Sequence, residues 1–247
     1  MEWGKRNPWA SGSNGLREVA NVNENDMASR ASLLEMSTPI DDILAHLPAA
    51  STTPYCKGQT IYGPGLASDS IYLVVSGTVG ISQIAEDGSE VLLEIVRPDE
   101  LFGESAFVNL SQRSEVATAM VSAELMTWSV RDVEEIVMRR PRLAVALLQI
   151  LARRNVELTR RIESLSIDNV ERRLARSLIR LSERLGAPEA DGSVRMMPLT
   201  HEMLSRYVGA SREIVTQFMI RFRKQGLVSY SRSGILLNPN TLRASIS

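Results

Sequence analysis

The sequence predicts an α+β fold in three parts: an N-terminal β-barrel of jelly-roll type, a long dimerisation helix and a C-terminal winged helix-turn-helix domain. Three observations predict it. Apolar residues alternate with a period of two from about Pro54 to Val130, as in short antiparallel strands. A heptad pattern runs through residues 141–166. Two short amphipathic helices flank a glycine turn between Thr200 and Gly226.

Composition is compatible with this division. The chain has 247 residues, of which 44% are hydrophobic, enough for two small domains and a connector. The net charge of -1 hides an asymmetry. Residues 166–247 carry 13 Lys and Arg against 7 Asp and Glu, whereas the rest of the chain carries 15 against 22. The excess positive charge therefore lies in the part with the helix-turn-helix, as contact with nucleic-acid phosphates requires.

Several classes of function are disfavoured. The single cysteine, Cys56, excludes an internal disulfide framework and any cluster held by several cysteines of one chain. No metal-ligand spacing is present, so His46 is expected to be structural and no metal site is expected. The chain shows no nucleophile–base pair and no phosphate-transfer loop, so it is not expected to be an enzyme. No stretch suits a membrane span or a signal peptide, which predicts a cytoplasmic protein without membrane contact.

Residues 1–37 are expected to form a mostly disordered tail, because they are rich in Asn, Ser, Gly and charge without a sustained period. Trp3 and Trp9 are unusual in such a tail. Either they dock on the folded part or the true start lies further along the chain. A short helix is expected from about Pro39 to His46.

The barrel is expected within residues 38–140 as short strands separated by turns. The turn signals are Pro64-Gly65, Ser76-Gly77 and Asp87-Gly88. The last of these predicts a hairpin. The alternating apolar positions are Ile71, Leu73 and Val75, then Val79 and Ile81, then Val91, Leu93 and Ile95.

One segment of the barrel has residue types that suit a ribose-phosphate ligand. Gly103 allows a close approach of the backbone, and Glu104 can accept a hydrogen bond from a hydroxyl group. Arg113 can bind a phosphate through two N–H groups, and Ser114 adds a hydroxyl. A surface salt bridge between Glu104 and Arg113 would explain the same residues.

The connector, residues 141–166, carries two sets of residues seven apart that interleave at three and four. They are Leu151, Leu158 and Leu165 at d positions and Leu148, Asn155 and Ile162 at a positions. A lone Asn at an a position favours a parallel two-stranded coiled coil. The alternative is a helix buried against its own barrel. The dimer is preferred because the flanking positions are charged; they include Arg153, Arg154, Glu157, Arg160 and Arg161.

Residues 167–247 are expected to form the winged helix-turn-helix domain. An amphipathic helix from Asp168 to about Gly186 is followed by a polar, mobile loop over residues 187–193. Thr200 caps the next helix, Gly209 ends it, and Ser211 caps the one after. The buried face of that last helix is formed by Val215, Phe218, Met219 and Phe222, and its other face by Arg212, Glu213, Thr216 and Gln217.

The second helix of a helix-turn-helix lies in the DNA major groove. Arg212 can bind guanine, Glu213 can accept from cytosine, and Gln217 prefers adenine. An ordinary helical hairpin with a solvated face is the alternative. Two apolar runs after Gly226 predict a hairpin wing. The expected DNA-binding residues are Thr200, His201, Ser211, Arg212, Glu213, Thr216 and Gln217, with Arg232 at the tip of the wing.

From about Thr60 to Leu237 the chain resembles the Crp/Fnr superfamily of bacterial transcription regulators. Two independent motifs in the right order carry the resemblance. The first is Gly103-Glu104 followed by Arg113-Ser114, similar to a phosphate-binding cassette, and the second is Ser211-Arg212-Glu213, similar to a recognition helix. The glycines that fall at the family's barrel positions are Gly65, Gly77, Gly88 and Gly103.

The resemblance implies a cyclic-nucleotide-binding type of barrel. Glu104 would then hold the ribose hydroxyl, with backbone help from Gly103, while Arg113 and Ser114 would hold the cyclic phosphate. Leu158 and Thr159 fall where related receptors carry two hydroxyl residues that contact adenine, and Leu158 has none. Cyclic AMP, cyclic GMP, another small effector or no effector all stay open. A haem or iron–sulfur sensor is disfavoured by two His and one Cys.

Two departures from the family pattern bear on the pocket. The segment between Glu104 and Arg113 is one residue shorter than in the best-known cyclic-AMP receptor. Glu115 stands where a small residue is usual. Facing the pocket, its charge would repel a phosphate. Because neighbouring residues of a strand point to opposite faces, Glu115 is expected to point away from the pocket when Ser114 faces it.

The resulting prediction is a homodimeric transcription regulator that binds a palindromic operator and works with RNA polymerase. Its half-site is expected to be related to, but different from, the TGTGA-like sequence typical of the family. Two alternatives stay open: a regulator with a vestigial nucleotide pocket that needs no effector, and a nucleotide-binding subunit that docks a protein. The positive charge of residues 166–247 argues against the second.

Overall fold

The computed structural model of the chain describes residues 43–108 and 111–246. The expectations for residues 1–37, with Trp3 and Trp9, and for the start of a helix at residue 39 lie outside this range. The described part begins with a short 3-10 helix, η1 (Ile43–Ala45). No helix within the described ranges is long and apolar enough to cross a membrane.

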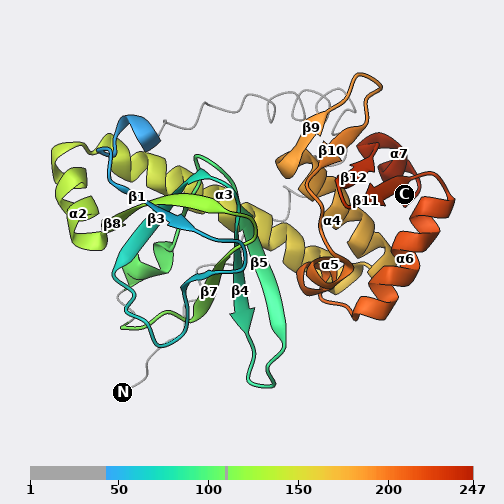
Figure 1. Ribbon diagram of the computed structural model, residues 1–247, viewed down its shortest axis with the longest axis horizontal. Helices are drawn as coiled ribbons and strands as arrows, with labels where there is room; N and C mark the ends of the chain where they lie inside the picture. Colours follow the sequence, from blue (N-terminus) through green and yellow to red (C-terminus); the bar gives the residue numbers. More distant parts are fainter. Residues whose placement is uncertain (1–42, 109–110, 247) are drawn as a thin grey trace, which may run out of the picture. The chain divides into compact units, whose positions relative to one another are not determined.

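The barrel consists of two four-stranded antiparallel sheets (Figure 1). The first sheet has the order β1 (Thr52–Tyr55), β8 (Ala123–Ser129), β3 (Ser70–Ser76) and β6 (Leu101–Phe102). The second has the order β2 (Thr60–Tyr62), β7 (Glu115–Ala119), β4 (Val79–Ile84) and β5 (Glu90–Val96). Apolar side chains from both sheets form a common core, which includes Tyr62, Val74, Val79, Phe102, Ala117 and Leu125. This arrangement confirms the predicted jelly-roll type of fold.

The Asp87-Gly88 turn joins β4 to β5, as predicted. The Asp87 carboxylate accepts a hydrogen bond from the amide of Ser89 at 2.9 Å. Gly88 has a φ of 81°, a left-handed conformation that a residue with a Cβ adopts only at a cost. Hydrogen bonding within three residues therefore fixes the hairpin.

The alternation predicted in β5 is wrong, because this strand contains a bulge. Ile81 of β4 is paired with Glu94, but the next residue, Ser82, is paired with Leu92. Leu93 is thus an extra residue, which reverses the alternation on one side of it. Leu92 and Ile95 are buried, and Val91 is exposed. The bulge gives β5 a second apolar surface, on the outside of the barrel.

Two helices follow the barrel. Helix α2 (Val130–Arg139) was not predicted; Ser129 caps it by accepting a hydrogen bond from the Asp132 amide at 3.1 Å. Helix α3 (Arg142–Ile167) covers the predicted heptad segment. The start of α3 packs on the barrel through Leu143 and Ala146, in an apolar cluster with Trp128 of β8. The rest of α3 runs on towards the C-terminal domain.

The C-terminal domain is a winged helix-turn-helix (Figure 1). Its helices are α4 (Val170–Leu185), α5 (His201–Val208), α6 (Arg212–Lys224) and α7 (Pro239–Ala244). Its strands are β9 (Gly186–Pro188), β10 (Val194–Met196), β11 (Val228–Ser231) and β12 (Gly234–Leu237), in the sheet order β11-β12-β10-β9. Strands β11 and β12 form the hairpin wing that the sequence predicts.

The expectation of a polar loop over residues 187–193 is partly wrong. Ala187 and Pro188 belong to β9, which pairs with β10, and the amide of Glu189 donates to the carbonyl of Ser193 at 2.8 Å across the turn. Because β10 also pairs with β12, this segment extends the sheet of the wing. Pairing with the next strand, β10, which is itself paired with the distant strand β12, overrode its polar composition.

The core of this domain also contains two residues of the barrel. Leu92 and Ile95, from the bulged strand β5, are in the same buried cluster as the apolar faces of α4, α5 and α6. The main helical members of the cluster are Leu174, Leu178, Leu204, Val208, Val215, Met219 and Phe222. The bulge therefore joins the barrel to the helix-turn-helix through a shared apolar core.

Two barrel glycines allow a test of packing around tight turns. Gly77 and Gly88 both have positive φ, but a Cβ at Gly77 would lie 2.7 Å from Ala123 Cα, whereas a Cβ at Gly88 would meet nothing within 4 Å. We expect Gly88→Ala to lower the free energy of unfolding by about 1–2 kcal/mol through backbone strain alone. Gly77→Ala should lower it by clearly more. Urea unfolding followed by circular dichroism measures both, and equal losses would contradict this packing.

Candidate nucleic-acid interface and barrel cavity

The turn between α5 and α6 has the local structure that the sequence predicts. Thr200 accepts a hydrogen bond from the Met203 amide at 3.1 Å and caps α5. Gly209 ends the helix in the left-handed conformation, with φ 69° and ψ 52°. Ser211 accepts from the Ile214 amide at 3.4 Å and caps α6. These caps fix the direction in which α6 leaves the turn.

Helix α6 has one buried face and one exposed face. Val215, Met219 and Phe222 are buried. The side chains of Arg212 and Glu213 are exposed in the first turn of the helix, and the side chain of Gln217 is exposed one turn later. A hydrogen bond to its own backbone amide holds the pKa of Glu213 below its usual value, so this side chain is an ionised acceptor.

His201 connects the two helices of the motif and the wing. Its Nδ1 atom lies 3.0 Å from the hydroxyl of Thr216 on α6, and its ring meets the ring of Tyr230 on β11 edge-on, with centroids 5.3 Å apart. Burial lowers the pKa of His201, and the nearby cations Arg212 and Arg223 lower it further. Thr216 is therefore paired inside the protein, while Arg232, in the turn of the wing, is exposed.

A cavity of about 880 Å³ lies between the barrel, α3 and α4. Of the predicted effector residues, Gly103, Glu104, Ser114 and Leu158 line it. Thr159 is not one of the described residues that line the cavity. Its hydroxyl donates a hydrogen bond to the carbonyl of Asn155 at 2.9 Å. The structure thus brings four of the six predicted residues to the cavity, three from the barrel and Leu158 from α3, and leaves two out of its lining.

Arg113 is the other predicted effector residue that is not among the described residues lining the cavity. It is 3% exposed. Its Nη1 donates to the carbonyl of Gly103 at 2.8 Å and to the hydroxyl of Ser105 at 2.9 Å, and its Nη2 donates to the carbonyl of Ser70. The guanidinium also lies over the ring of Tyr62, 4.2 Å from its centroid. The protein itself therefore supplies most of its partners.

The expectation that Glu115 points away from the cavity is wrong. Its carboxylate faces the cavity and accepts hydrogen bonds from Ser105 at 2.5 Å, from Ser114 at 3.1 Å and from Tyr62 at 3.4 Å. It also lies 3.6 Å from Nη1 of Arg113. Strand alternation does not apply to this pair, because Ser114 precedes the first residue of β7 and is not part of a strand.

The charge on Glu115 is stabilised. Burial acts to raise its pKa, but hydrogen bonds from Ser105 and Ser114 hold the pKa below the usual value. Burial also raises the pKa of Tyr62, and the neighbouring carboxylate raises it further. At neutral pH the site therefore contains an ionised carboxylate, a neutral phenol and the cation of Arg113.

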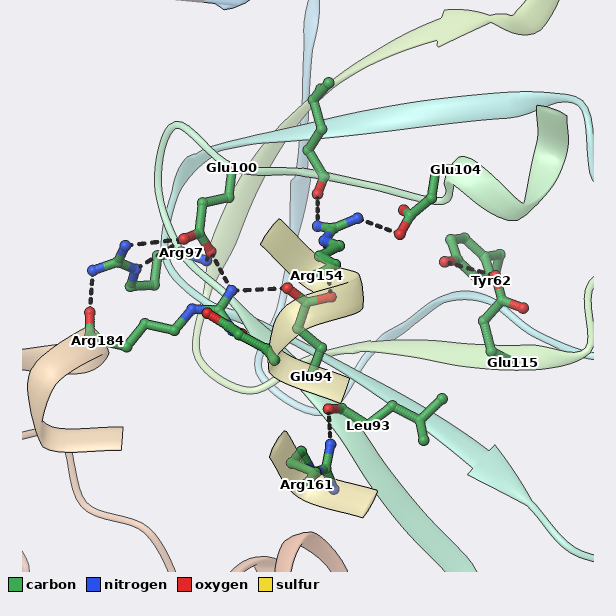
Figure 2. Close-up of polar contacts among 12 residues, drawn as sticks. Tyr62, Leu93, Glu94, Arg97, Glu100, Glu104, Glu115, Arg154, Arg161 and Arg184 are labelled. Atoms are coloured by element: carbon green, nitrogen blue, oxygen red, sulfur yellow. Dashed lines mark hydrogen bonds and ion pairs between the residues drawn. The ribbon is translucent and has the colours of Figure 1, made fainter. Parts of the chain in front are cut away.

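Glu104 belongs to a second ionic network, which the sequence did not reveal (Figure 2). Arg154 of α3 forms an ion pair with Glu104 and another with Glu94 of β5, at 3.2 Å. Arg184 of α4 reaches Glu94 at 2.8 Å and Glu100 at 2.9 Å. Burial raises the pKa of Glu94, although both arginines act to lower it. The network holds α3 and α4 against the barrel.

Arg161 joins the barrel, α3 and α5. It donates to the carbonyl of Leu93, to that of Leu92 at 3.1 Å and to that of Tyr207 on α5 at 3.0 Å. Its guanidinium also lies 4.4 Å from the centroid of the Tyr207 ring. From the sequence, Arg154 and Arg161 are identified only as charged positions that flank a dimer seam, whereas in the structure both bind the barrel of their own chain. Their spacing of seven residues, which places both on one face of the helix, was the available signal.

Substitution of Arg161 tests this connection. Arg161→Met leaves three carbonyl groups without their donor, so we expect the free energy of unfolding to fall by about 2–4 kcal/mol. Arg160→Met is the matched control, because Arg160 is the neighbouring residue of the same helix and is exposed. It should change the free energy by less than about 0.5 kcal/mol. Similar losses in the two variants, measured by urea unfolding, would remove the structural role of Arg161.

Comparison with known proteins agrees with this architecture. A family model for cyclic nucleotide-binding domains matches residues 52–140, and one for Crp-like helix-turn-helix domains matches residues 172–245. The chain is 30% identical over 183 residues to the CRP-like cAMP-activated global transcriptional regulator of Mycobacterium tuberculosis, covering 74% of this chain and 81% of that protein. It is 32% identical over 185 residues to the transcriptional regulator SdrP of Thermus thermophilus, covering 74% and 86%.

A solved structure gives the same result. A Crp/Fnr-family transcriptional regulator from Thermus thermophilus superposes with a TM-score of 0.65 at 29% identity, over 79% of this chain and 98% of that one. The sheet order of the barrel, the capped helix-turn-helix and these matches lead to one conclusion. The chain belongs to the Crp/Fnr family of transcription regulators, with a cyclic nucleotide-binding domain followed by a Crp-like helix-turn-helix domain.

Proposed function

We propose that the protein acts as a homodimer that binds a palindromic DNA operator, with one α6 in each of two successive major grooves. The observation that carries this proposal is the division of α6. Its inner face is buried, while Arg212, Glu213 and Gln217 are exposed on its outer face. A helix held rigidly by one face can present the other to base edges. The excess of basic residues in this domain supplies the attraction to phosphate.

Each exposed residue has a distinct role in this proposal. Arg212 donates two hydrogen bonds to guanine, Glu213 accepts from cytosine N4, and Gln217 binds adenine. The capping residues Thr200 and Ser211 lie at helix N-termini, where backbone amides favour phosphate. Three further residues complete the proposed set. His201 and Arg232 contact phosphates, and Thr216 lies close to the groove. The half-site is then related to TGTGA but different from it.

The proposed dimer forms along α3. The apolar side chains of its heptad positions are exposed in the single chain, and Leu148 and Ile162 are the most exposed of them, at 66% and 64%. The others in this set are Leu151, Leu158 and Leu165. A second copy of the same helix would cover them, with Asn155 setting the register. A dimer also supplies the two recognition helices that a palindrome requires.

Besides DNA and a second copy, the proposal includes a small effector and RNA polymerase. The cavity that Gly103, Glu104, Ser114 and Leu158 line is the place for an effector, and cyclic AMP, cyclic GMP and other small molecules are the candidates. The similarity of the chain to the cAMP-activated regulator of Mycobacterium tuberculosis supports this choice. A second candidate is a regulator that needs no effector; the position of Arg113 behind the carboxylate of Glu115 favours it.

Arg212→Ala tests the role in base recognition. We expect a loss of about 1–3 kcal/mol in binding at one base position of the half-site, with relaxed preference at that position. Arg232→Ala is the control, because a phosphate contact should weaken all sequences alike and reduce the salt dependence. Binding of a panel of single-base operator variants, measured by fluorescence anisotropy, separates the two. A uniform loss for Arg212→Ala would contradict direct base contact.

Ile162→Arg tests the dimer. A charge at this exposed apolar position should raise the dimer dissociation constant by at least about tenfold, because a paired seam would have to bury it. Glu163→Arg is the control. It changes the charge by more than Ile162→Arg does, at the next residue, which is also exposed but lies off the seam. It should leave the dimer intact. Sedimentation velocity measures both, and an unchanged dimer in Ile162→Arg would place the interface elsewhere.

A further inference from the structure

We propose that Glu115 is a built-in occupant of the phosphate position of this barrel: its side-chain carboxylate takes the place beside Arg113 that the phosphate of a cyclic nucleotide would need. The protein then binds its operator without a nucleotide, and cyclic nucleotides bind weakly or not at all. This inference rests on the proposed DNA-binding function, and of the two candidates for its regulation it takes the second, the regulator that needs no effector, in place of a cyclic-nucleotide effector.

Both Nη atoms of Arg113 are bonded within the protein. A guanidinium has donors in a fixed plane and binds a phosphate through two of them. Here Nη1 is bonded to the carbonyl of Gly103 and the hydroxyl of Ser105, and Nη2 is bonded to the carbonyl of Ser70. The side chain is 1% exposed. The edge of the guanidinium that carries both Nη atoms is therefore not free for a ligand, and its third nitrogen, Nε, is buried without a hydrogen-bond partner among the described residues.

The carboxylate of Glu115 lies beside Arg113, at the lining of the cavity. Glu115, Ser105 and Ser114 all line the cavity, and Arg113 does not among the described residues. Glu115 Oε1 is 3.6 Å from Arg113 Nη1 and accepts from both Ser105 and Tyr62. An anion that approaches Arg113 from the cavity would lie against this negative charge. It would have to displace a group that already has three hydrogen-bond donors: Ser105, Ser114 and Tyr62.

The carboxylate of Glu115 is ionised in the protein without a ligand. The hydrogen bonds from Ser105 and Ser114 keep the pKa of Glu115 below its usual value in spite of burial. The groups facing it are the cation of Arg113, two hydroxyls and the phenol of Tyr62, whose pKa burial raises. At the pH of a cell an approaching phosphate therefore meets the negative charge of Glu115.

The other end of a ribose-phosphate site is also occupied from within. Glu104, the residue placed to accept from a ribose hydroxyl, forms an ion pair with Arg154 of α3. Arg154 also bonds the carbonyl of Leu101 and pairs with Glu94. The contacts that a bound nucleotide would make to the barrel and to α3 are thus replaced by contacts of the chain with itself. The arrangement between the barrel and the connecting helix does not wait for a ligand.

The experiment is a titration of the full-length protein with cyclic AMP and with cyclic GMP by isothermal calorimetry. Four proteins are compared: the wild type, Glu115→Ala, Glu115→Gln and Glu86→Ala. Glu115→Ala empties the position, and Glu115→Gln keeps its shape but removes the charge. Glu86→Ala is the matched control, because it removes one negative charge from an exposed position on the β4–β5 hairpin of the same barrel. Thermal unfolding of each variant identifies any loss of fold.

We expect no saturable binding of either nucleotide to the wild type or to Glu86→Ala at millimolar concentration. Glu115→Ala should bind at least one of them at least about tenfold more tightly than the wild type. Glu115→Gln should change in the same direction, which keeps the test valid if the alanine variant unfolds. Tight binding to the wild type would overturn the inference. It would also be overturned if neither folded variant of Glu115 gained affinity.

A gel shift separates failure of this inference from failure of the proposed function. The probe is a duplex enriched from a random pool by the wild-type protein. The wild type should shift it without nucleotide, and added cyclic AMP should change the midpoint by less than about twofold. A shift that requires nucleotide overturns the role of Glu115 and keeps the DNA-binding function. Failure to enrich any specific duplex, with or without nucleotide, contradicts the DNA-binding function itself.

Discussion

The structure depends most on the contact between Arg161 and three main-chain carbonyl groups. Two of these carbonyls, of Leu92 and Leu93, belong to the bulge in β5, and the third belongs to Tyr207 on α5. One side chain therefore ties a strand of the barrel to the connecting helix and to the first helix of the helix-turn-helix. A buried guanidinium is costly without its partners. For this reason the barrel cannot shift against α5 without losing these bonds.

The ionic network beside Arg161 fixes the position of α3 and α4 on the barrel more than it adds to the free energy of unfolding. Glu94 is largely buried between Arg154 and Arg184, and burial raises its pKa. Desolvation of such groups offsets much of their attraction, whereas the loss of one partner leaves an uncompensated charge. The network therefore penalises every arrangement in which α3 and α4 are displaced from β5. It complements the apolar contact of β5 with the core of the C-terminal domain.

Sequence reasoning succeeded where a feature depends on a few neighbouring residues. The caps at Thr200 and Ser211 and the turn at Gly209 are each decided within three or four positions. It failed where distant residues decide the outcome. Glu115 is oriented by a hydroxyl ten positions away, and Arg161 binds a carbonyl 69 positions away. A bulge changes the alternation of a strand without any signature in its composition, so the surface of β5 was also out of reach.

An acceptor that belongs to the polypeptide differs from a dissolved ligand in one respect: its local concentration is fixed by the covalent chain. Glu115 accompanies Arg113 in every molecule, whatever the metabolic state of the cell. If the barrel carries its own counter-ion, as proposed above, occupancy of an operator follows the amount of regulator present and not the concentration of a nucleotide. Control then passes from the chemistry of the binding pocket to the synthesis and degradation of the regulator.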